Sequence, residues 1–388
     1  MIGGERIPKA ALSGITVLDL SRLLPGPFCS MILADHGAMV IAIEDRKQYQ
    51  ADGLFLPNVC RNKQHMALDL KSASGKAIFF KLVEQADVIL EGFRPGVVQR
   101  LGVDYESVCR VKPDIIYCSV TGYGQTGEFR DRVGHDANYL GYAGVLNMIG
   151  ATDQPPSIPG VQIADMAGGG MNAAIGILLA LFAREKTGAG QHVDISMTDG
   201  MVGLLPVAFY WKTLTGETPR RGDNMLSHRY ACYNTYETAD GRHMVVGAVE
   251  GKFWRAICER LGLAEYAGHQ YDDDRREEII AVLRNTFRTK TMAQWEKALA
   301  DLDLCVSGVR TADEVLDFSL FREREMVVEA PGAGGQPETT IGVPVKLSRT
   351  PGSVRSASVH FGQDTEKILL ELGYRPEQIA ELASDGVI

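Results

Sequence analysis

Short apolar runs alternate with amphipathic stretches along the first third of the chain. Gly14 to Leu20 and Ala38 to Glu44 are apolar runs of strand length, and Pro27 to His36 between them has helical spacing. These three segments predict a right-handed β-α-β unit. The alternation continues with a helix, a strand, a short helix and a strand, over residues 74–85, 87–90, 97–101 and 114–119. The pattern predicts an α/β fold with an open parallel sheet.

The pattern changes beyond the middle of the chain. Asp165 to Phe182 is a glycine-containing apolar stretch that predicts a long, tightly packed helix beginning at Asp165. Polar residues with Gly and Pro over 206–228 suggest a linker, which would close a large first domain over 1–205. Beyond it we expect a small α+β domain over 229–325 and a return to the large domain over 326–388. The predicted elements of these parts are strands at 230–236, 244–248 and 341–347, and helices at 253–261, 275–288, 291–299 and 365–372.

Composition narrows the class of protein. Hydrophobic residues make up 45% of the 388 residues and charged residues 23%, as in soluble globular proteins. The net charge of -9 disfavours nucleic acid as a partner, because such binding needs a surplus of Lys and Arg. The sequence shows neither a signal peptide nor an uninterrupted apolar run of roughly 18 residues, so no membrane span is expected. The seven cysteines are scattered without a C-x-x-C pair, which favours a cytoplasmic protein without disulfides or a metal site.

The first β-α-β unit resembles a dinucleotide site in one respect, since Glu44 and Asp45 follow its second strand. Its turn, Ser21 to Pro27, lacks the three spaced glycines that a pyrophosphate requires. The sequence therefore disfavours a nicotinamide enzyme.

Three acidic or imidazole positions are candidates for chemistry, and each has a simpler structural explanation. Asp165 could cap the long helix or act as a base or nucleophile beside its glycines. His135, which precedes Asp136, could be a surface group or a proton carrier. Glu250 could be a solvated residue at a strand end. Residue type alone leaves these alternatives open.

Basic side chains lie near the ends of predicted strands, where open α/β sheets bind anions. They form either a solvated surface or a site for a phosphate-rich ligand. These residues are Arg61, Lys63, Lys71 and Arg94.

Ordered motifs along essentially the whole chain resemble the family III CoA-transferase (CaiB/BaiF) superfamily. They are Leu12-Ser13-Gly14, Leu18-Asp19-Leu20, Pro25-Gly26-Pro27, Arg61-Asn62-Lys63, Leu68-Asp69-Leu70-Lys71, Phe93-Arg94-Pro95-Gly96, Thr121-Gly122-Tyr123-Gly124-Gln125, Asp165 on its glycine-rich helix, Arg184-Glu185-Lys186-Thr187-Gly188 with Gly190-Gln191, and Pro344-Val345. The resemblance implies a Rossmann-like large domain, a small domain, and an interlocked homodimer with active sites between subunits. It also implies that coenzyme A enters as part of an acyl-CoA substrate, without a further cofactor.

Within this superfamily the chain resembles the racemases, which act on 2-methylacyl-CoA thioesters. His135 lies in Gly134-His135-Asp136-Ala137-Asn138-Tyr139, and Glu250 ends Gly247-Ala248-Val249-Glu250, both as in the racemase pattern. The resemblance implies that His135 and Asp165 exchange the α-proton through an enolate, that Glu250 orients the imidazole and that Asp136 shapes the same network. The residues expected to contact CoA are Arg46, Arg61, Lys63, Arg94 and Tyr139.

Two other functions remain possible on the sequence. A transferase would use Asp165 as the nucleophile that carries acyl and CoA groups between carboxylic acids. A scaffold that binds CoA without catalysis would need neither His135 nor Asp165.

Overall fold

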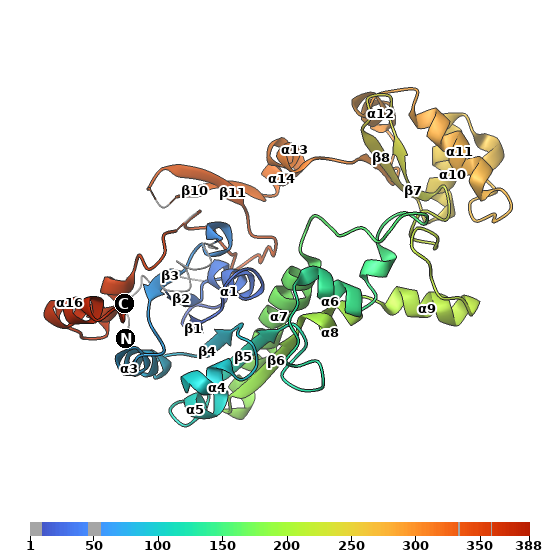
Figure 1. Ribbon diagram of the computed structural model, residues 1–388. Helices are drawn as coiled ribbons and strands as arrows, with labels where there is room; N and C mark the ends of the chain where they lie inside the picture. Colours follow the sequence, from blue (N-terminus) through green and yellow to red (C-terminus); the bar gives the residue numbers. More distant parts are fainter. Residues whose placement is uncertain (1–9, 46–55, 333, 358) are drawn as a thin grey trace. The chain divides into compact units, whose positions relative to one another are not determined.

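The computed structural model describes residues 10–45, 56–332, 334–357 and 359–388, and these form two compact units (Figure 1). Unit 1 takes in the chain up to Ala143, then Pro159–Leu204 and Ser319–Ile388. Unit 2 consists of Gly144–Ile158 and Leu205–Phe318.

The boundary between the two units differs from the expected one, which assigned residues 1–205 to the large domain and residues 206–228 to a linker. Gly144–Ile158 groups with unit 2 because Arg221 binds it through the carbonyl of Ala151 at 2.9 Å and the carbonyl of Gln154 at 2.5 Å. The expected linker also contains a regular helix, α9 (Pro206–Thr215).

Unit 1 is built on a six-stranded parallel sheet with the order β3-β2-β1-β4-β5-β6. This is the strand order of Rossmann-type sheets, so the predicted α/β class with an open parallel sheet is confirmed. The central strands are fully buried apolar runs, as expected where helices cover both faces. The strands are β1 (Thr16–Asp19), β2 (Met39–Glu44), β3 (Gln64–Ala67), β4 (Val88–Glu91), β5 (Ile116–Thr121) and β6 (Gln191–Ser196).

Helices flank the sheet and begin at residues suited to helix starts. Pro25 opens α1, and Ser72 caps α3 by accepting the N–H of Gly75 at 2.9 Å. The unit 1 helices are α1 (Pro25–Asp35), α3 (Ala73–Val83), α4 (Val97–Leu101), α5 (Tyr105–Cys109), α6 (Asp136–Tyr142), α7 (Asn172–Thr187), α8 (Met197–Val202), α14 (Ser319–Glu323), α15 (Thr365–Glu371) and α16 (Pro376–Ser384), with the 3-10 turn η1 (Pro57–Val59).

The C-terminal segment completes the core of unit 1. Ile368, Leu369 and Ile379 pack in one cluster with Leu18 of β1 and Phe79 of α3. The predicted helix at 365–372 is therefore not the last element, because α16 follows it and buries Ile379. The expected strand over 341–347 is also wrong. The antiparallel strands of this region are β10 (Val327–Pro331) and β11 (Pro337–Ile341).

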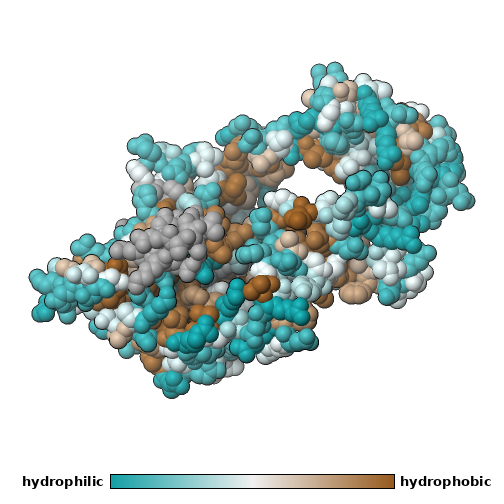
Figure 2. Space-filling model, viewed as in Figure 1, coloured by the Kyte–Doolittle hydropathy of each residue, from teal (hydrophilic) through white to brown (hydrophobic). Residues whose placement is uncertain are grey.

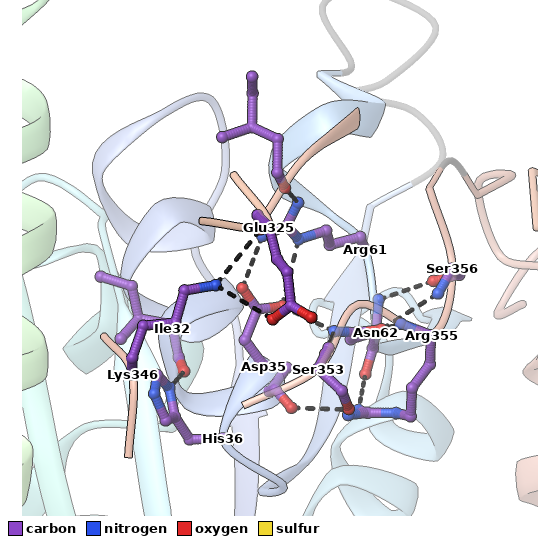
Figure 3. A network of polar contacts seen from close by, with 12 residues as sticks. Ile32, Asp35, His36, Arg61, Asn62, Glu325, Lys346, Ser353, Arg355 and Ser356 are labelled. Atoms are coloured by element: carbon purple, nitrogen blue, oxygen red, sulfur yellow. Dashed lines mark hydrogen bonds and ion pairs between the residues drawn. The ribbon is translucent and has the colours of Figure 1, made fainter. Parts of the chain in front are cut away.

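A buried polar network fixes the same segment to α1 (Figure 3). The Asp35 carboxylate accepts the Arg61 guanidinium at 3.2 and 2.7 Å and the Asn62 amide at 2.6 Å. Asn62 in turn accepts the backbone N–H groups of Arg355 at 2.6 Å and Ser356 at 3.2 Å. These bonds satisfy buried charges and join residues almost 300 positions apart in the sequence.

One helical segment, Ala164–Thr187, is long and apolar enough to cross a membrane by length and composition alone. A core helix passes the same test, and one face of this segment is buried through Ala173, Ile177 and Ala180. Its other face exposes an apolar stripe at helical spacing, formed by Ile175, Leu178, Leu179 and Phe182. Figure 2 shows that apolar residues also reach the surface elsewhere among polar ones.

Unit 2 combines a small antiparallel sheet with helices around its own core, as an α+β domain does. Trp254, Tyr236, Phe287 and Trp295 are central to that core. The sheet contains β7 (Tyr233–Glu237), β8 (His243–Gly247) and β9 (Val306–Gly308), and the helices are α9, α10 (Gly251–Leu261), α11 (Arg276–Phe287), α12 (Met292–Leu299) and α13 (Ala312–Asp317), with the 3-10 turns η2 (Leu146–Met148) and η4 (Ala264–Tyr266).

Candidate active site

A cavity of about 1010 Å³ lies at the carboxyl ends of the parallel strands of unit 1. Asp19 at the end of β1, Glu44 at the end of β2, Gly92 after β4 and Thr121 at the end of β5 all line it. β1 and β4 are neighbours in the sheet, and the strand order reverses between them. Ligands of open α/β proteins bind at this switch point, because the loops there diverge and leave a crevice.

The lining of the cavity mixes basic and apolar side chains. Its apolar part includes Leu68, Leu70, Phe93, Val97 and Phe361. Its basic side chains are Arg22, Lys63, Lys71, Arg94, Arg130 and Arg132. Such a lining suits an elongated ligand with anionic groups and an apolar portion.

Asp165 lines this cavity from an unusual helix. Residues Ala164–Met171 form a π-helix, η3, which continues into α7, whereas the sequence predicted a regular helix that begins at Asp165. The glycines explain the close packing, because a Cβ on Gly168 would lie 2.7 Å from the carbonyl of Met197 and one on Gly170 would lie 2.8 Å from that of Pro25. Wide π-turns often occur at functional sites.

Asp136 connects α6 to η3 and crowds the carboxyl of Asp165. Its Oδ1 accepts the backbone N–H of Asp165 at 3.0 Å, so Asp165 lies inside the first helical turn and does not cap it. The pKa of Asp165 is raised to about 6, first by burial and then by the negative charge of Asp136, while His135 opposes both effects. A carboxyl with this pKa can both accept and return a proton near neutral pH.

His135 lines the same cavity and directly precedes α6. Its backbone N–H donates to Oδ1 of Asn138 at 3.0 Å, which fixes the turn, while the residue itself is exposed. Because its charge lowers the pKa of Asp165, the imidazole lies within electrostatic range of that carboxyl. The structure thus brings His135, Asp136 and Asp165 together.

Tyr139 and Arg94 lie at the same part of the cavity. The Tyr139 hydroxyl donates to the carbonyl of Gly134 at 2.5 Å, and its ring takes the space that a Cβ on Gly122 would need. Burial raises the pKa of Tyr139 to about 12, with Asp165 adding to the effect and Arg94 opposing it. The phenol therefore stays protonated and can donate a hydrogen bond at neutral pH.

The two basic residues expected to contact CoA before β3 differ in position. Lys63 lines the cavity, although its ammonium already donates to the carbonyl of Pro27 at 2.9 Å and faces Asp19 at 3.5 Å. Arg61 is not part of the lining, because its guanidinium is buried against Asp35 and the carbonyl of Ile341. The geometry gives Arg61 a structural role in place of the expected ligand contact.

Two further predicted site residues lie outside the described residues of unit 1. Glu250 belongs to unit 2, where it is exposed and precedes α10. Its pairing with His135 stays a prediction. Arg46 lies outside the described residues.

Sequence reasoning missed three arginines of the lining, Arg22, Arg130 and Arg132. A signal for each was present. Arg22 lies in the first turn after a strand, and the other two lie in the turn-rich stretch after β5, where parallel sheets place their ligands.

Other parts of the described chain are weaker candidates for a functional site. A second cavity, of about 680 Å³, lies within unit 2 and is lined by none of the predicted site residues. Among the residues that the structure describes, no group of three or more His, Cys, Asp or Glu side chains could hold a metal ion.

Comparison with known proteins gives one consistent family. The profile of CoA-transferase family III matches residues 12–365. The chain is 38% identical over 382 residues to an alpha-methylacyl-CoA racemase of Homo sapiens, covering 97% of each chain. It is 31% identical to a succinyl-CoA–D-citramalate CoA-transferase of Chloroflexus aurantiacus, covering 98% of this chain and 99% of the relative. A solved CAIB/BAIF family protein from Brucella suis has the same fold, with a TM-score of 0.81, 27% identity, and coverage of 94% of this chain and 100% of that one.

Proposed function

The chain belongs to CoA-transferase family III, and on that premise we propose that it is a racemase of 2-methylacyl-CoA thioesters. The observation that carries the proposal is the pairing of Asp165, whose pKa is raised to about 6, with His135 in one cavity. An enzyme that inverts a carbon centre needs two groups that both give and take protons near neutral pH.

In the proposed mechanism one of the two groups removes the proton from the carbon next to the thioester. The electron pair moves onto the thioester oxygen and forms an enolate. The other group then donates a proton to the opposite face of the same carbon. Asp136 holds the backbone of Asp165 and keeps its carboxyl weakly acidic, and Glu250 is expected to orient His135.

The same cavity supports an acyl-CoA ligand. Arg22, Lys71, Arg94, Arg130 and Arg132 supply positive charge for the phosphates, and the apolar wall accommodates the acyl chain. We propose that CoA enters with the substrate and that no other cofactor is needed. Because the net charge is -9, the attraction of these anionic groups rests on this local cluster.

A single incubation separates inversion from other chemistry. One pure epimer of a 2-methylacyl-CoA is incubated with the protein in deuterated water. We expect deuterium at the α-carbon and a mixture of epimers. If the thioester keeps both its α-proton and its configuration, the racemase proposal is wrong.

The second candidate is a CoA transferase, favoured by relatives such as the succinyl-CoA–D-citramalate CoA-transferase. Asp165 would then attack the thioester carbonyl, expel CoA as a thiolate and carry the acyl group as an anhydride. Mixing acyl-CoA with a free carboxylic acid tests this reaction. Exchange of CoA between the two acids would support the transferase.

We also propose that the protein works as an interlocked homodimer in the cytoplasm, without nucleic acid or membrane as a partner. The exposed stripe of α7, in which Leu179 is 64% exposed, supports a second copy as its cover. Sedimentation should give twice the 42.3 kDa mass of one chain, and Leu179→Glu should weaken the dimer. A monomeric wild type, or binding to neutral lipid vesicles, would contradict this proposal.

A further inference from the structure

Glu91 is a buried carboxyl behind the wall of the cavity, and the proposed chemistry does not use it. It ends β4 and is 1% exposed. Its Oε2 accepts the backbone N–H of Phe93 at 2.7 Å. Phe93 and Arg94 line the cavity, so this bond fixes the first residue of a turn that contacts the ligand space.

Ser119 extends the contact of Glu91 across the sheet. It is the direct partner of Glu91 in the β4–β5 register, and hydrogen bonding by its side chain lowers the pKa of the Glu91 carboxyl. The same hydroxyl oxygen lies 3.0 Å from Nε2 of His192 on β6. A hydroxyl has one proton to donate, so the Glu91–Ser119–His192 chain has two possible directions.

Glu91 and His192, the two ends of this hydrogen-bonded series, have different surroundings. The His192 ring stacks on the ring of Tyr105, with ring centres 5.5 Å apart and an angle of 17° between the two planes. Burial of the ring lowers the pKa of His192, which favours the neutral imidazole, and a neutral imidazole can accept or donate at Nε2.

Burial raises the pKa of Glu91 to about 7, although the bonds from Ser119 and Phe93 act in the opposite direction. The negative charge of Asp194 on β6 also contributes to this raised pKa. The other titratable groups whose charges couple to Glu91 are Tyr117 and Cys118 of β5, and burial keeps both protonated.

We propose that Glu91 is a positioning residue, whose ionised carboxylate holds the Phe93–Arg94 turn for CoA binding and whose protonation reverses the Glu91–Ser119–His192 chain. The inference rests on the proposed function only in taking a CoA thioester as the ligand. When Glu91 is ionised, Ser119 donates to it and accepts from His192. When Glu91 is protonated, it donates to Ser119, which donates to His192, and the bond from Phe93 loses its charge assistance.

The sign of the pH effect follows from this arrangement. The charged form predominates above the pKa of Glu91, so the turn is held most firmly there. The affinity for CoA should therefore fall as the pH decreases through neutrality.

The test is calorimetric titration of the whole protein with free CoA between pH 5.5 and 8.5. Glu91→Gln is a close mimic of the protonated acid, because its amide oxygen accepts from Phe93 and its NH₂ donates to Ser119. Because the CoA phosphates titrate in the same pH range, the two proteins are compared at each pH. The quantity is the dissociation constant for CoA of Glu91→Gln divided by that of the wild type. We expect the wild type to bind about fivefold more tightly at pH 8.5 and equally at pH 5.5.

The ratio changes with pH between two limits, and the midpoint is the pH halfway through this change. Two further substitutions should shift this midpoint in opposite directions. Ser119→Ala removes a bond that lowers the pKa of Glu91, so the midpoint should move to higher pH. Asp194→Asn removes a repulsion, so the midpoint should move to lower pH. A ratio that does not change with pH overturns this inference alone. Absence of CoA binding by the wild type at every pH overturns the proposed function with it.

Discussion

Two groups of buried carboxyls in unit 1 differ in how their charge is compensated. Asp35 is 2% exposed and accepts three hydrogen bonds from Arg61 and Asn62 (Figure 3). Asp165 lies beside a second carboxyl, Asp136, in a site where burial also disfavours its charge. The first arrangement neutralises a charge by an opposite one, whereas the second crowds two like charges.

The difference shows which carboxyls serve the fold and which serve chemistry. A compensated buried charge joins segments, and removal of its partner leaves a charge that water cannot reach. A carboxyl held at a raised pKa destabilises the folded protein when ionised and is therefore reactive toward protons. We expect mutations in the two groups to separate stability from activity.

The largest effect is expected at Asp165. Asp165→Asn keeps the size of the side chain but removes a proton-transferring group, so the rate of epimer inversion should fall by about 10³-fold. Chiral chromatography of the products measures this rate. Loss of less than tenfold would show that another group performs the proton transfer.

A large loss of stability, with the chemistry intact, is expected at Arg61. Arg61→Met should lower the free energy of unfolding by about 3–5 kcal/mol, because Asp35 then remains buried without its counter-charge. Urea denaturation measures the loss. The matched control is the double variant with Asp35→Leu, which should recover much of the stability. If the single variant is as stable as the wild type, the network does not hold the fold.

A smaller effect is expected on the pH profile. Asp136→Asn retains an oxygen for the N–H of Asp165 but removes the charge that raises its pKa. The acidic limb of kcat/KM, expected near pH 6 in the wild type, should shift down by about one unit. An unchanged limb would mean that Asp165 is not the group that titrates.

The smallest effect is a gain in stability from Asp165→Asn. The pKa of Asp165 is about 6 in the folded protein, above an ordinary value of about 3.9, so its stabilising contribution is complete below about pH 4 and is lost as the pH rises through 6. The variant should therefore be more stable than the wild type by roughly 1–2 kcal/mol at pH 8 and equal to it below pH 4. Thermal unfolding at both pH values measures the difference. Equal stability at pH 8 would contradict the raised pKa.

Hydrophobic periodicity was sufficient to predict the central strands of the unit 1 sheet and insufficient to predict its edge strands. The buried strands β1, β2, β4 and β5 are apolar runs, so the parallel sheet was predictable. Strands β3 and β6 begin with Gln-His pairs, and β6 is largely exposed, so their patterns did not predict strands.

The candidate site was predictable in its residue types but not in its electrostatics. His135, Asp136 and Asp165 came from motifs, whereas the π-helix depends on glycines that face Met197 and Pro25 across the fold. The role of Arg61 depends on Asp35, which is 26 residues away. Such pairings follow from tertiary contacts, which spacing along one chain does not encode.

The most direct test of two opposed proton-transferring groups is α-hydrogen exchange by the variants that lack one of them. His135→Ala and Asp165→Asn are each incubated with each pure epimer in deuterated water, and mass spectrometry follows deuterium uptake. We predict that neither variant inverts the carbon, and that each still exchanges the α-proton of one epimer, a different one for each variant. Exchange of the same epimer by both variants would contradict it.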